Sequence, residues 1–308
     1  MKRMNVFVLV SCVLAISVVA RAQPVYQPST ERPPFDQVEI TTTDLGNRVY
    51  MLQGEGANMT IAVSGDGVIM VDTEFAELNQ KIKDAIAAIT DLPIRYLIIT
   101  HFHRDHTGGN AGFARDGAII VSHENVKTVL EAGSLNGLTG NVVPPAPAEA
   151  LPRITFDDAA AIHLEGHTAR LMHRSNWHTD GDTQVYFPEA DILVTGDIVS
   201  FGLYPNIDVS YGGSIDGMIE GVDALLQIAN DDTKIVPGHG PVGDKAMMVE
   251  FRQMLVDVRT RIARQIAQGL TEDEAVAARP NADYDAALGM NAQRAGNFVR
   301  VVYRSLAN

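Results

Sequence analysis

Short apolar segments rich in β-branched residues alternate with turn residues along much of the chain. Val, Ile, Thr and Met dominate these segments, and Gly, Asp and Asn separate them, which is the pattern of strands. The first four segments follow one another with only turns between them, so they predict an antiparallel opening. The expected strands cover residues 38–42, 49–53, 58–64, 67–72, 95–100, 118–122, 160–164, 169–173, 183–187, 191–195 and 234–236.

Segments with helical periodicity lie between and after these strands. In residues 74–90, Leu78, Ile82 and Ile86 fall on one helical face. A loop rich in Gly, Pro, Ala and Asn is expected at residues 133–150. The further helices are expected at residues 124–132, 216–228, 245–268, 271–278 and 286–306. Strands and helices mixed in this order predict an α/β fold of layered sheets covered by helices.

The N-terminal residues have the pattern of a secretory signal peptide. Lys2 and Arg3 precede an apolar run that ends at Ala20-Arg21-Ala22. Because the run has only about 15 residues and a membrane span needs roughly 20, no membrane association beyond the signal peptide is expected. Residues 1–22 are therefore predicted to be cleaved after Ala22, which makes the protein periplasmic or secreted. Residues 23–36 carry four prolines and predict an extended N-terminal arm.

Charge and cysteine content narrow the partners and the chemistry. Removal of Lys2, Arg3 and Arg21 leaves 21 basic against 38 acidic residues, a net charge of 21 − 38 = −17. Such a surface repels phosphate backbones, so a small-molecule substrate is expected and nucleic acid is not. The sole cysteine, Cys12, lies within the predicted signal peptide. Any metal in the mature protein must therefore be bound by imidazole and carboxylate.

The densest group of ligand-type side chains follows the apolar segment at 95–100. His101, His103, Asp105 and His106 fill four of six successive positions, and Gly108-Gly109 follow them. A strand end that continues into a glycine-containing loop can aim several side chains at one point. Zinc binds imidazole and carboxylate, and three or four such groups with a water form a catalytic site. A chance cluster on a surface loop is disfavoured because the chain has only nine histidines.

The pattern H-x-H-x-D-H after an apolar strand resembles the signature of the metallo-β-lactamase superfamily, whose fold is an αββα sandwich of two mixed β-sheets flanked by helices. His178 in HTDGDTQVYFP, Asp197 in DILVTGD and His239 in VPGHGPV follow in the family's order. The resemblance covers most of the mature chain and implies that residues 37–308, including the C-terminal helices, form one hydrolase domain.

The same resemblance implies a ligand set for two Zn²⁺ ions. His101, His103 and His178 would hold one zinc; Asp105, His106 and His239 would hold the other, with Asp197 bridging. Asp105 and Asp197 would also take part in catalysis. Two zinc ions can share a water, lower its pKa from 15.7 to near 7 and present hydroxide to a substrate. Redox members of the superfamily carry a carboxylate where this chain has His103, so hydrolysis is favoured over iron redox chemistry.

One histidine competes with His178 for the third ligand position. His167 in E-G-H-T also resembles the G-H-T element that often carries this ligand. His178 is preferred because it precedes Asp197 by nineteen residues, with a predicted strand hairpin between them that would bring both together. The remaining histidines are expected outside the ligand set: His163, His167 and His173 on a sheet face or behind a ligand, and His123 solvated at the start of a helix.

Several positions keep two interpretations open. Asp72 ends the segment at 67–72, and it either orients a metal ligand or is a strand-end turn residue. The loop at 133–150 is either a lid or a flexible connection. The aromatic and amide side chains around the ligands either wall the substrate site or pack as ordinary loop residues. These rim candidates are Asn176, Trp177, Phe201, Tyr204, Asn206 and Tyr211.

The substrate depends on the loops more than on the ligand set. The leading expectation is a secreted di-zinc hydrolase that opens a cyclic amide or ester, either a β-lactam or a lactone. The bridging Asp197 is similar to glyoxalase II and lactonases, whereas most acquired zinc β-lactamases carry Cys or Ser there. One alternative is therefore a glyoxalase-II-like thioesterase or ester hydrolase. The other is a non-catalytic zinc-binding protein.

Overall fold

The computed structural model describes residues 33–288 and 291–307. The predicted signal peptide, and residues 23–32 of the predicted arm, lie outside the described residues. Within the described part, no helix is long and apolar enough to cross a membrane.

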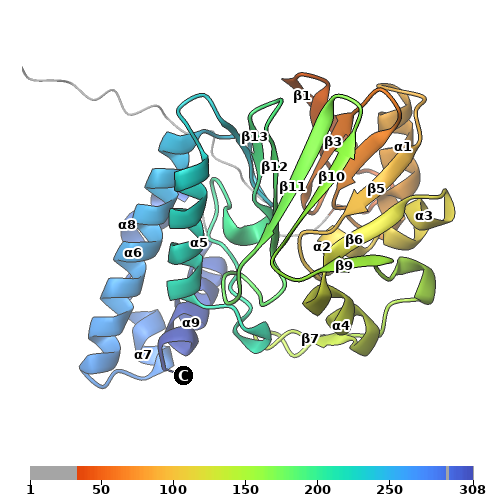
Figure 1. The fold of residues 1–308 in the computed structure, drawn as a ribbon. Coiled ribbons are helices and arrows are strands. Elements are labelled where there is room, and N and C mark those ends of the chain that lie inside the picture. The colour runs from red at the N-terminus through yellow and green to blue at the C-terminus, as the bar shows by residue number, and fades with distance from the viewer. Residues whose placement is uncertain (1–32, 289–290, 308) are drawn as a thin grey trace, which may run out of the picture.

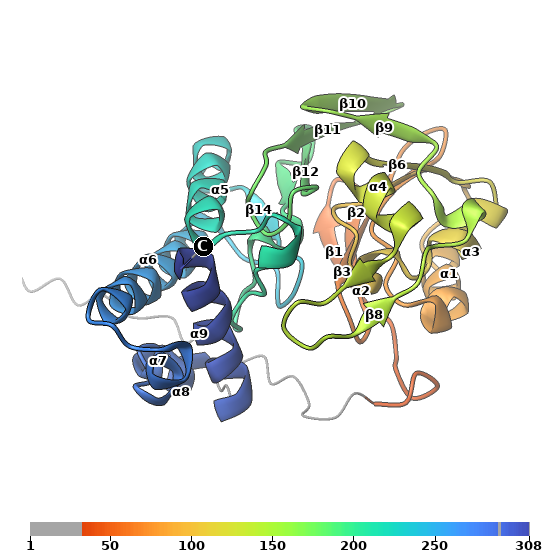
Figure 2. The ribbon, with the colours of Figure 1, turned by 90° about the horizontal axis from the view of Figure 1, so that it is seen from below.

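In the described part of the chain, two mixed sheets lie face to face with helices on both outer sides (Figures 1 and 2). The first sheet runs in the order β1 (Thr41–Gly46), β2 (Val49–Gln53), β3 (Asn58–Val63), β4 (Val68–Val71), β5 (Ile94–Ile98), β6 (Ile119–His123) and β9 (Ile154–Phe156). Strands β1 to β4 are antiparallel, as predicted, whereas β5, β6 and β9 are added in parallel.

The second sheet runs in the order β10 (Ala159–Leu164), β11 (His167–His173), β12 (Thr183–Phe187), β13 (Ile192–Val194) and β14 (Lys234–Val236). It is antiparallel except at one edge, where β13 and β14 are parallel. Central strands such as β3 and β13 are buried along their whole length because both faces are covered. In the edge strand β10, successive residues alternate between exposed and partly buried.

The helices cover the two outer faces, so the chain buries three apolar layers. The first sheet packs against α1 (Asn79–Ala87), α3 (Asn110–Arg115) and α4 (Glu124–Ala132). The second packs against α5 (Ile215–Ile228), α6 (Lys245–Ala267) and α9 (Ala292–Ala307), with α7 (Glu272–Ala277) and α8 (Ala282–Leu288) beyond them. A third apolar layer, which includes Ile69, Val121 and Leu171, lies between the sheets. The predicted αββα sandwich is confirmed.

The structure departs from the predicted elements at several places. The helix expected at 286–306 is two helices, and the first ends at Leu288, directly before the poor helix former Gly289. The helix expected from residue 74 starts later, because Glu74 has a left-handed backbone (φ 57°) and a short 3-10 turn (Ala76–Leu78) precedes α1. The three-residue strand β9 and the short helix α3 were not predicted.

The segment 133–150, predicted as a loop, contains a small hairpin. Strands β7 (Ser134–Leu135) and β8 (Val142–Val143) pair antiparallel, and a 3-10 turn follows at Ala148–Ala150. We call residues 134–143 the cleft hairpin.

Candidate metal centre

The seven predicted ligands lie at the same end of the sandwich, each at or beyond the end of a strand. Two residues separate His101 from the end of β5, and Asp105 and His106 lie in the short helix α2 (Arg104–Thr107). His178 lies in the loop between β11 and β12. Asp197 lies in a 3-10 turn (Gly196–Ile198) after β13, and His239 follows β14. The strand ends of both sheets therefore deliver these side chains to one place.

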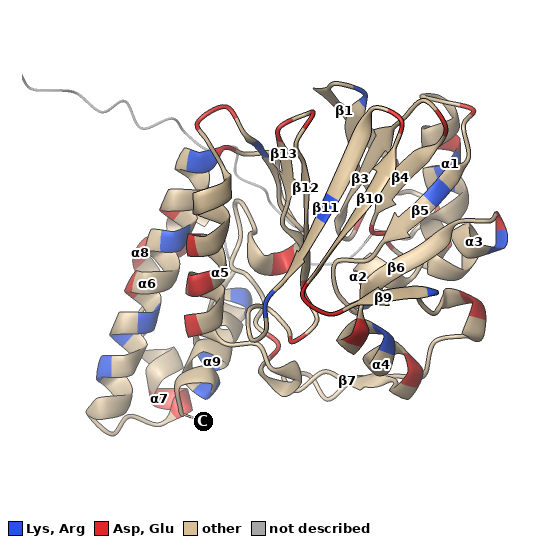
Figure 3. Ribbon diagram, viewed as in Figure 1, with Lys and Arg blue, Asp and Glu red and all other residues tan. Residues whose placement is uncertain are grey.

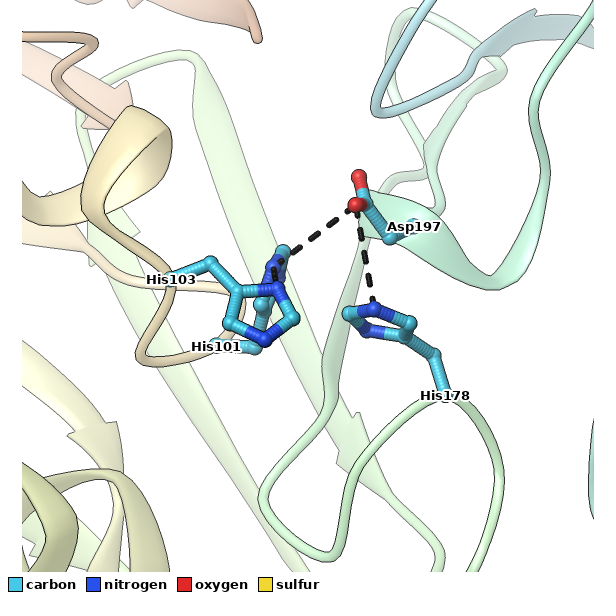
Figure 4. A group of neighbouring side chains, drawn as sticks. All are labelled: His101, His103, His178 and Asp197. Atoms are coloured by element: carbon cyan, nitrogen blue, oxygen red, sulfur yellow. Dashed lines mark hydrogen bonds and ion pairs between the residues drawn. The ribbon is translucent and has the colours of Figure 1, made fainter. Parts of the chain in front are cut away.

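The ligand atoms form two groups in which each atom lies within 4.8 Å of the others. One group contains His101, His103, His178 and Asp197, and Figure 4 shows these four side chains converging. The other contains Asp105, His106 and His239. Asp197 touches both groups: its Oδ2 lies 3.8 Å from Nε2 of His178, and its Oδ1 lies 3.2 Å from Nε2 of His106. This is the arrangement that the family resemblance implies.

Gly238 lets Asp197 reach this position. A Cβ atom at residue 238 would lie 2.0 Å from Oδ1 of Asp197 and 2.8 Å from the carbonyl carbon of Gly196. Any side chain there would push the carboxylate away from the histidines, which gives the glycine of the P-G-H-G segment a physical reason.

Two of the buried histidines are held through Nδ1, so that Nε2 faces the cluster. Nδ1 of His106 lies 2.7 Å from Oδ2 of Asp72. Thr100 donates its backbone N–H and its hydroxyl to the same carboxylate, and its Oγ1 accepts from Nδ1 of His101 at 3.0 Å. Asp72 is itself fully buried with φ 61°. Its side chain thus lies where the ligand-orienting interpretation places it.

His103 is held from the opposite nitrogen. Its Nε2 lies 2.9 Å from Oδ2 of Asp208, so Nδ1 is the nitrogen that faces His101, at 3.1 Å. His178 follows the first pattern: Nδ1 lies 3.4 Å from Oδ1 of Asp182, whose other oxygen accepts the backbone N–H of His178 at 2.7 Å. Each ring therefore has a fixed tautomer and one free nitrogen for a metal.

His239 completes the set through a backbone contact. Its Nδ1 donates to the carbonyl oxygen of Gly56 at 3.2 Å, and the N–H of Gly56 donates to Glu74 at 2.7 Å. Burial raises the pKa of Glu74 to about 7. A Cβ at residue 56 would lie 2.6 Å from Glu74 and 2.8 Å from Asp105, so only glycine allows this approach. Nε2 of His239 is left 3.4 Å from both Asp105 and Asp197.

The electrostatics of the cluster favour a bound cation. Burial lowers the pKa of His239, but Asp197 and Asp105 outweigh it and raise that pKa to about 9. Burial opposes protonation of His106 as well, yet Asp197 and Asp72 hold its pKa well above the usual value. The carboxylates thus create a field that attracts positive charge. Nε2 of His178 is buried without a hydrogen-bond partner, which costs free energy. A bond from this nitrogen to a metal ion would remove that cost.

The four other histidines lie outside both groups. His167, the competing candidate, begins β11 and is buried near the ring of Phe187. His163 is exposed on β10, and His173 lies behind the site, with Nδ1 donating to the carbonyl oxygen of Asp182 at 2.8 Å. These positions agree with the expectation of sheet-face and supporting roles. His123 caps α4 as predicted, but the prediction that it is solvated is wrong, because its ring stacks on His173 and is buried.

A cleft of about 830 Å³ opens over the cluster, and His103, Asp105, Asp197 and His239 line its floor. Of the rim candidates, Asn206 and Tyr211 line the cleft. Asn176 is exposed and does not line the cleft, whereas Trp177, Phe201 and Tyr204 are packed in the apolar core against the second sheet and its helices. Tyr204 stacks on Phe298 and donates its hydroxyl to Asp285.

Sequence reasoning missed the residues that orient the ligands, chiefly Asp182, Asp208 and the carbonyl of Gly56. Asp182 had a local signal, since it lies four residues after His178 in a tight Asp- and Gly-containing turn. Asp208 had none, because 105 residues separate it from His103 and only the tertiary fold brings the two together.

Known proteins match the chain in sequence. A family model described as the metallo-beta-lactamase superfamily matches residues 52–239. The chain is 30% identical over 171 residues to the 2,4-dinitroanisole O-demethylase subunit alpha of Nocardioides sp., covering 54% of this chain and 49% of that protein. It is 30% identical over 197 residues to the probable metallo-hydrolase YqgX of Bacillus subtilis, covering 61% and 87%. The chain thus spans about half the length of the demethylase subunit.

A solved structure matches the fold. The metallo-beta-lactamase from Pontibacter korlensis superposes with a TM-score of 0.57 at 19% identity, covering 71% of this chain and 100% of that chain. At this identity the likeness concerns the arrangement of sheets and helices alone.

Proposed function

Since this chain belongs to the metallo-beta-lactamase superfamily, we propose that it is an exported hydrolase that uses two zinc ions to open a small cyclic ester or amide, a lactone or a β-lactam. One observation carries the proposal. Five imidazoles each have one nitrogen held by a neighbouring group, and their other nitrogens converge with two carboxylates on a single cleft. This is the preparation that a metal site needs.

The donor set fits zinc. Imidazole and carboxylate are ligands that zinc accepts, and no thiolate is required. His101, His103 and His178 would hold one ion; Asp105, His106 and His239 would hold the other, with Asp197 between them. When bound, the pair of ions supplies a water of lowered pKa and polarises the carbonyl oxygen of the substrate.

The chain's own residues contribute position and proton transfer. The side chains of Asp105 and His239 are 27% and 22% exposed, so the site meets solvent on this side. Burial by itself raises the pKa of Asp105, but His106 and His239 outweigh it, and the carboxyl stays ionised. A carboxylate oxygen of Asp105 can therefore accept the proton that an attacking water loses.

A substrate panel on the zinc-loaded protein tests the function. We expect turnover of a lactone or a chromogenic β-lactam at least about tenfold above that of an acyl thioester, because a ring holds its ester or amide in one conformation and loses less freedom on binding. Removal of zinc with a chelator should abolish turnover, and added zinc should restore it. Preferred cleavage of the thioester would favour the thioesterase alternative. Full zinc occupancy with no turnover of any substrate would favour a non-catalytic zinc-binding protein.

A further inference from the structure

The cleft over the metal centre has an apolar wall formed by the cleft hairpin and the prolines after it. Leu135, Val142 and Val143 line the cleft and are 50%, 75% and 39% exposed. Few large apolar side chains are this exposed in the described part of the chain, and half of those that are belong to this hairpin. Exposed apolar groups gathered beside a site of reaction are typical of a binding surface.

The hairpin is held in place from both sides. The backbone N–H of Leu135 donates to the hydroxyl of Tyr211 at 2.9 Å, and the ring of Tyr211 packs on Phe102 with centroids 4.7 Å apart. On the other side, Arg304 of α9 donates to the carbonyl oxygen of Gly137 at 3.2 Å. The wall is therefore a preformed part of the site, which lowers the cost of binding.

The wall carries no charge, and the side chains that line the rest of the cleft offer little positive charge. Residues 133–148 contain no Asp, Glu, Lys or Arg, and the β7 segment is drawn without charged residues in Figure 3. Among the described residues that line the cleft, Arg104 is the one Lys or Arg, and it is paired with Glu77 at 3.1 Å. Of the aspartates on the same lining, Asp208 is paired with His103, and Asp105 and Asp197 belong to the ligand set, where two zinc ions would neutralise them. An anionic group that lies along the wall, away from the ligand cluster, would find no positive partner there.

We propose that the substrate is an uncharged cyclic ester with an apolar arm, which lies along Leu135, Val142 and Val143 while its carbonyl faces the ligand cluster. This inference rests on the proposed function for the reaction, but the charge and apolar character of the ligand follow from the wall itself. It disfavours β-lactams and glutathione thioesters, because both carry carboxylates.

Two esters with the same leaving group and acyl length test the charge preference. The zinc-loaded protein is assayed with 4-nitrophenyl hexanoate and with the anionic mono-4-nitrophenyl ester of adipic acid. We expect kcat/KM to be about tenfold higher for the hexanoate. The kcat/KM of the hexanoate should also exceed that of 4-nitrophenyl acetate by about 15-fold, since four methylenes half-buried on the wall give about twofold each. Equal or faster cleavage of the adipate ester would overturn the proposal.

A pair of matched variants locates the effect on the wall. Val142→Lys places a cation in the cleft, whereas Val249→Lys makes the same change on α6, at a side chain that is also exposed (49%). For Val142→Lys we expect kcat/KM on the hexanoate to fall about threefold and on the adipate ester to rise about fivefold. Val249→Lys should leave both unchanged. Identical behaviour of the two variants would contradict the assignment of the wall.

A binding measurement separates this inference from the proposed reaction. The ketones 2-decanone and 9-oxodecanoate have the same length, differ in charge and are not hydrolysed. Calorimetry on the metal-free protein, where no zinc can bind the carboxylate, should give the lower Kd for 2-decanone, and Val142→Lys should reverse the order. If no ester or lactone is turned over but this order holds, the hydrolase proposal fails and the ligand class stands. Tighter binding of 9-oxodecanoate to the unmutated protein would refute the ligand class whatever the reaction.

Discussion

Replacing Asp197 by Asn should lower kcat by roughly 10²-fold to 10³-fold while KM changes little, because this carboxylate holds the reacting groups in place in the transition state. Its oxygens lie 3.2 Å from Nε2 of His106, 3.4 Å from Nε2 of His239 and 3.8 Å from Nε2 of His178. Asn keeps the shape of the side chain and removes its charge. The variant should therefore lose affinity for the second zinc, and excess zinc should restore part of the rate.

Metal content and rate measured on the same sample separate this role from a structural one. If Asp197 only ends the turn after β13, Asp197→Asn would keep both zinc ions and near-normal turnover, and would lose about 1 kcal/mol of stability as when a helix cap is removed. Unchanged kinetics with both ions bound would exclude Asp197 from the site.

His178→Ala should remove the zinc held with His101 and His103, together with the activity, since a ligand with its orienting partner Asp182 is lost. His167→Ala is the matched control. Both rings are buried, so both variants create a cavity, but His167 lies outside the two ligand groups. We expect His167→Ala to keep its zinc content and rate.

Elemental analysis of the two purified variants measures the difference directly. Zinc loss in His167→Ala with retention in His178→Ala would mean that the strand hairpin between His178 and Asp197 does not bring the third imidazole to the site.

Most strands could be predicted from the sequence, because they are short segments rich in β-branched residues and are separated by residues typical of turns. β2, β12 and β14 lie where the pattern predicts them. One error occurs where a single residue changes the direction of the backbone: the left-handed Glu74 delays the start of α1. The cleft hairpin was missed because its strands have two residues each, fewer than any periodicity can reveal.

The ligand positions could be read from the sequence, whereas their surroundings could not. His101, His103, Asp105 and His106 stand within six residues, so their convergence is a local property of one strand end. The burial of His123 is not local, since it depends on the stacking of its ring on His173 from the other sheet. The same limit applies to the rim candidates. Tyr204 stacks on Phe298 whereas Tyr211 lines the cleft, and only tertiary packing decides this difference.

Titration of metal-free protein with zinc, with bound metal and rate measured at each step, tests most directly that the chain is a di-zinc hydrolase. We predict that turnover reaches its plateau as the zinc content approaches about two ions per chain, the number that the ligand groups can hold. His103→Ala should reach a plateau near one ion and lose the activity. Full turnover without metal, or two tightly bound ions in His103→Ala, would contradict the account.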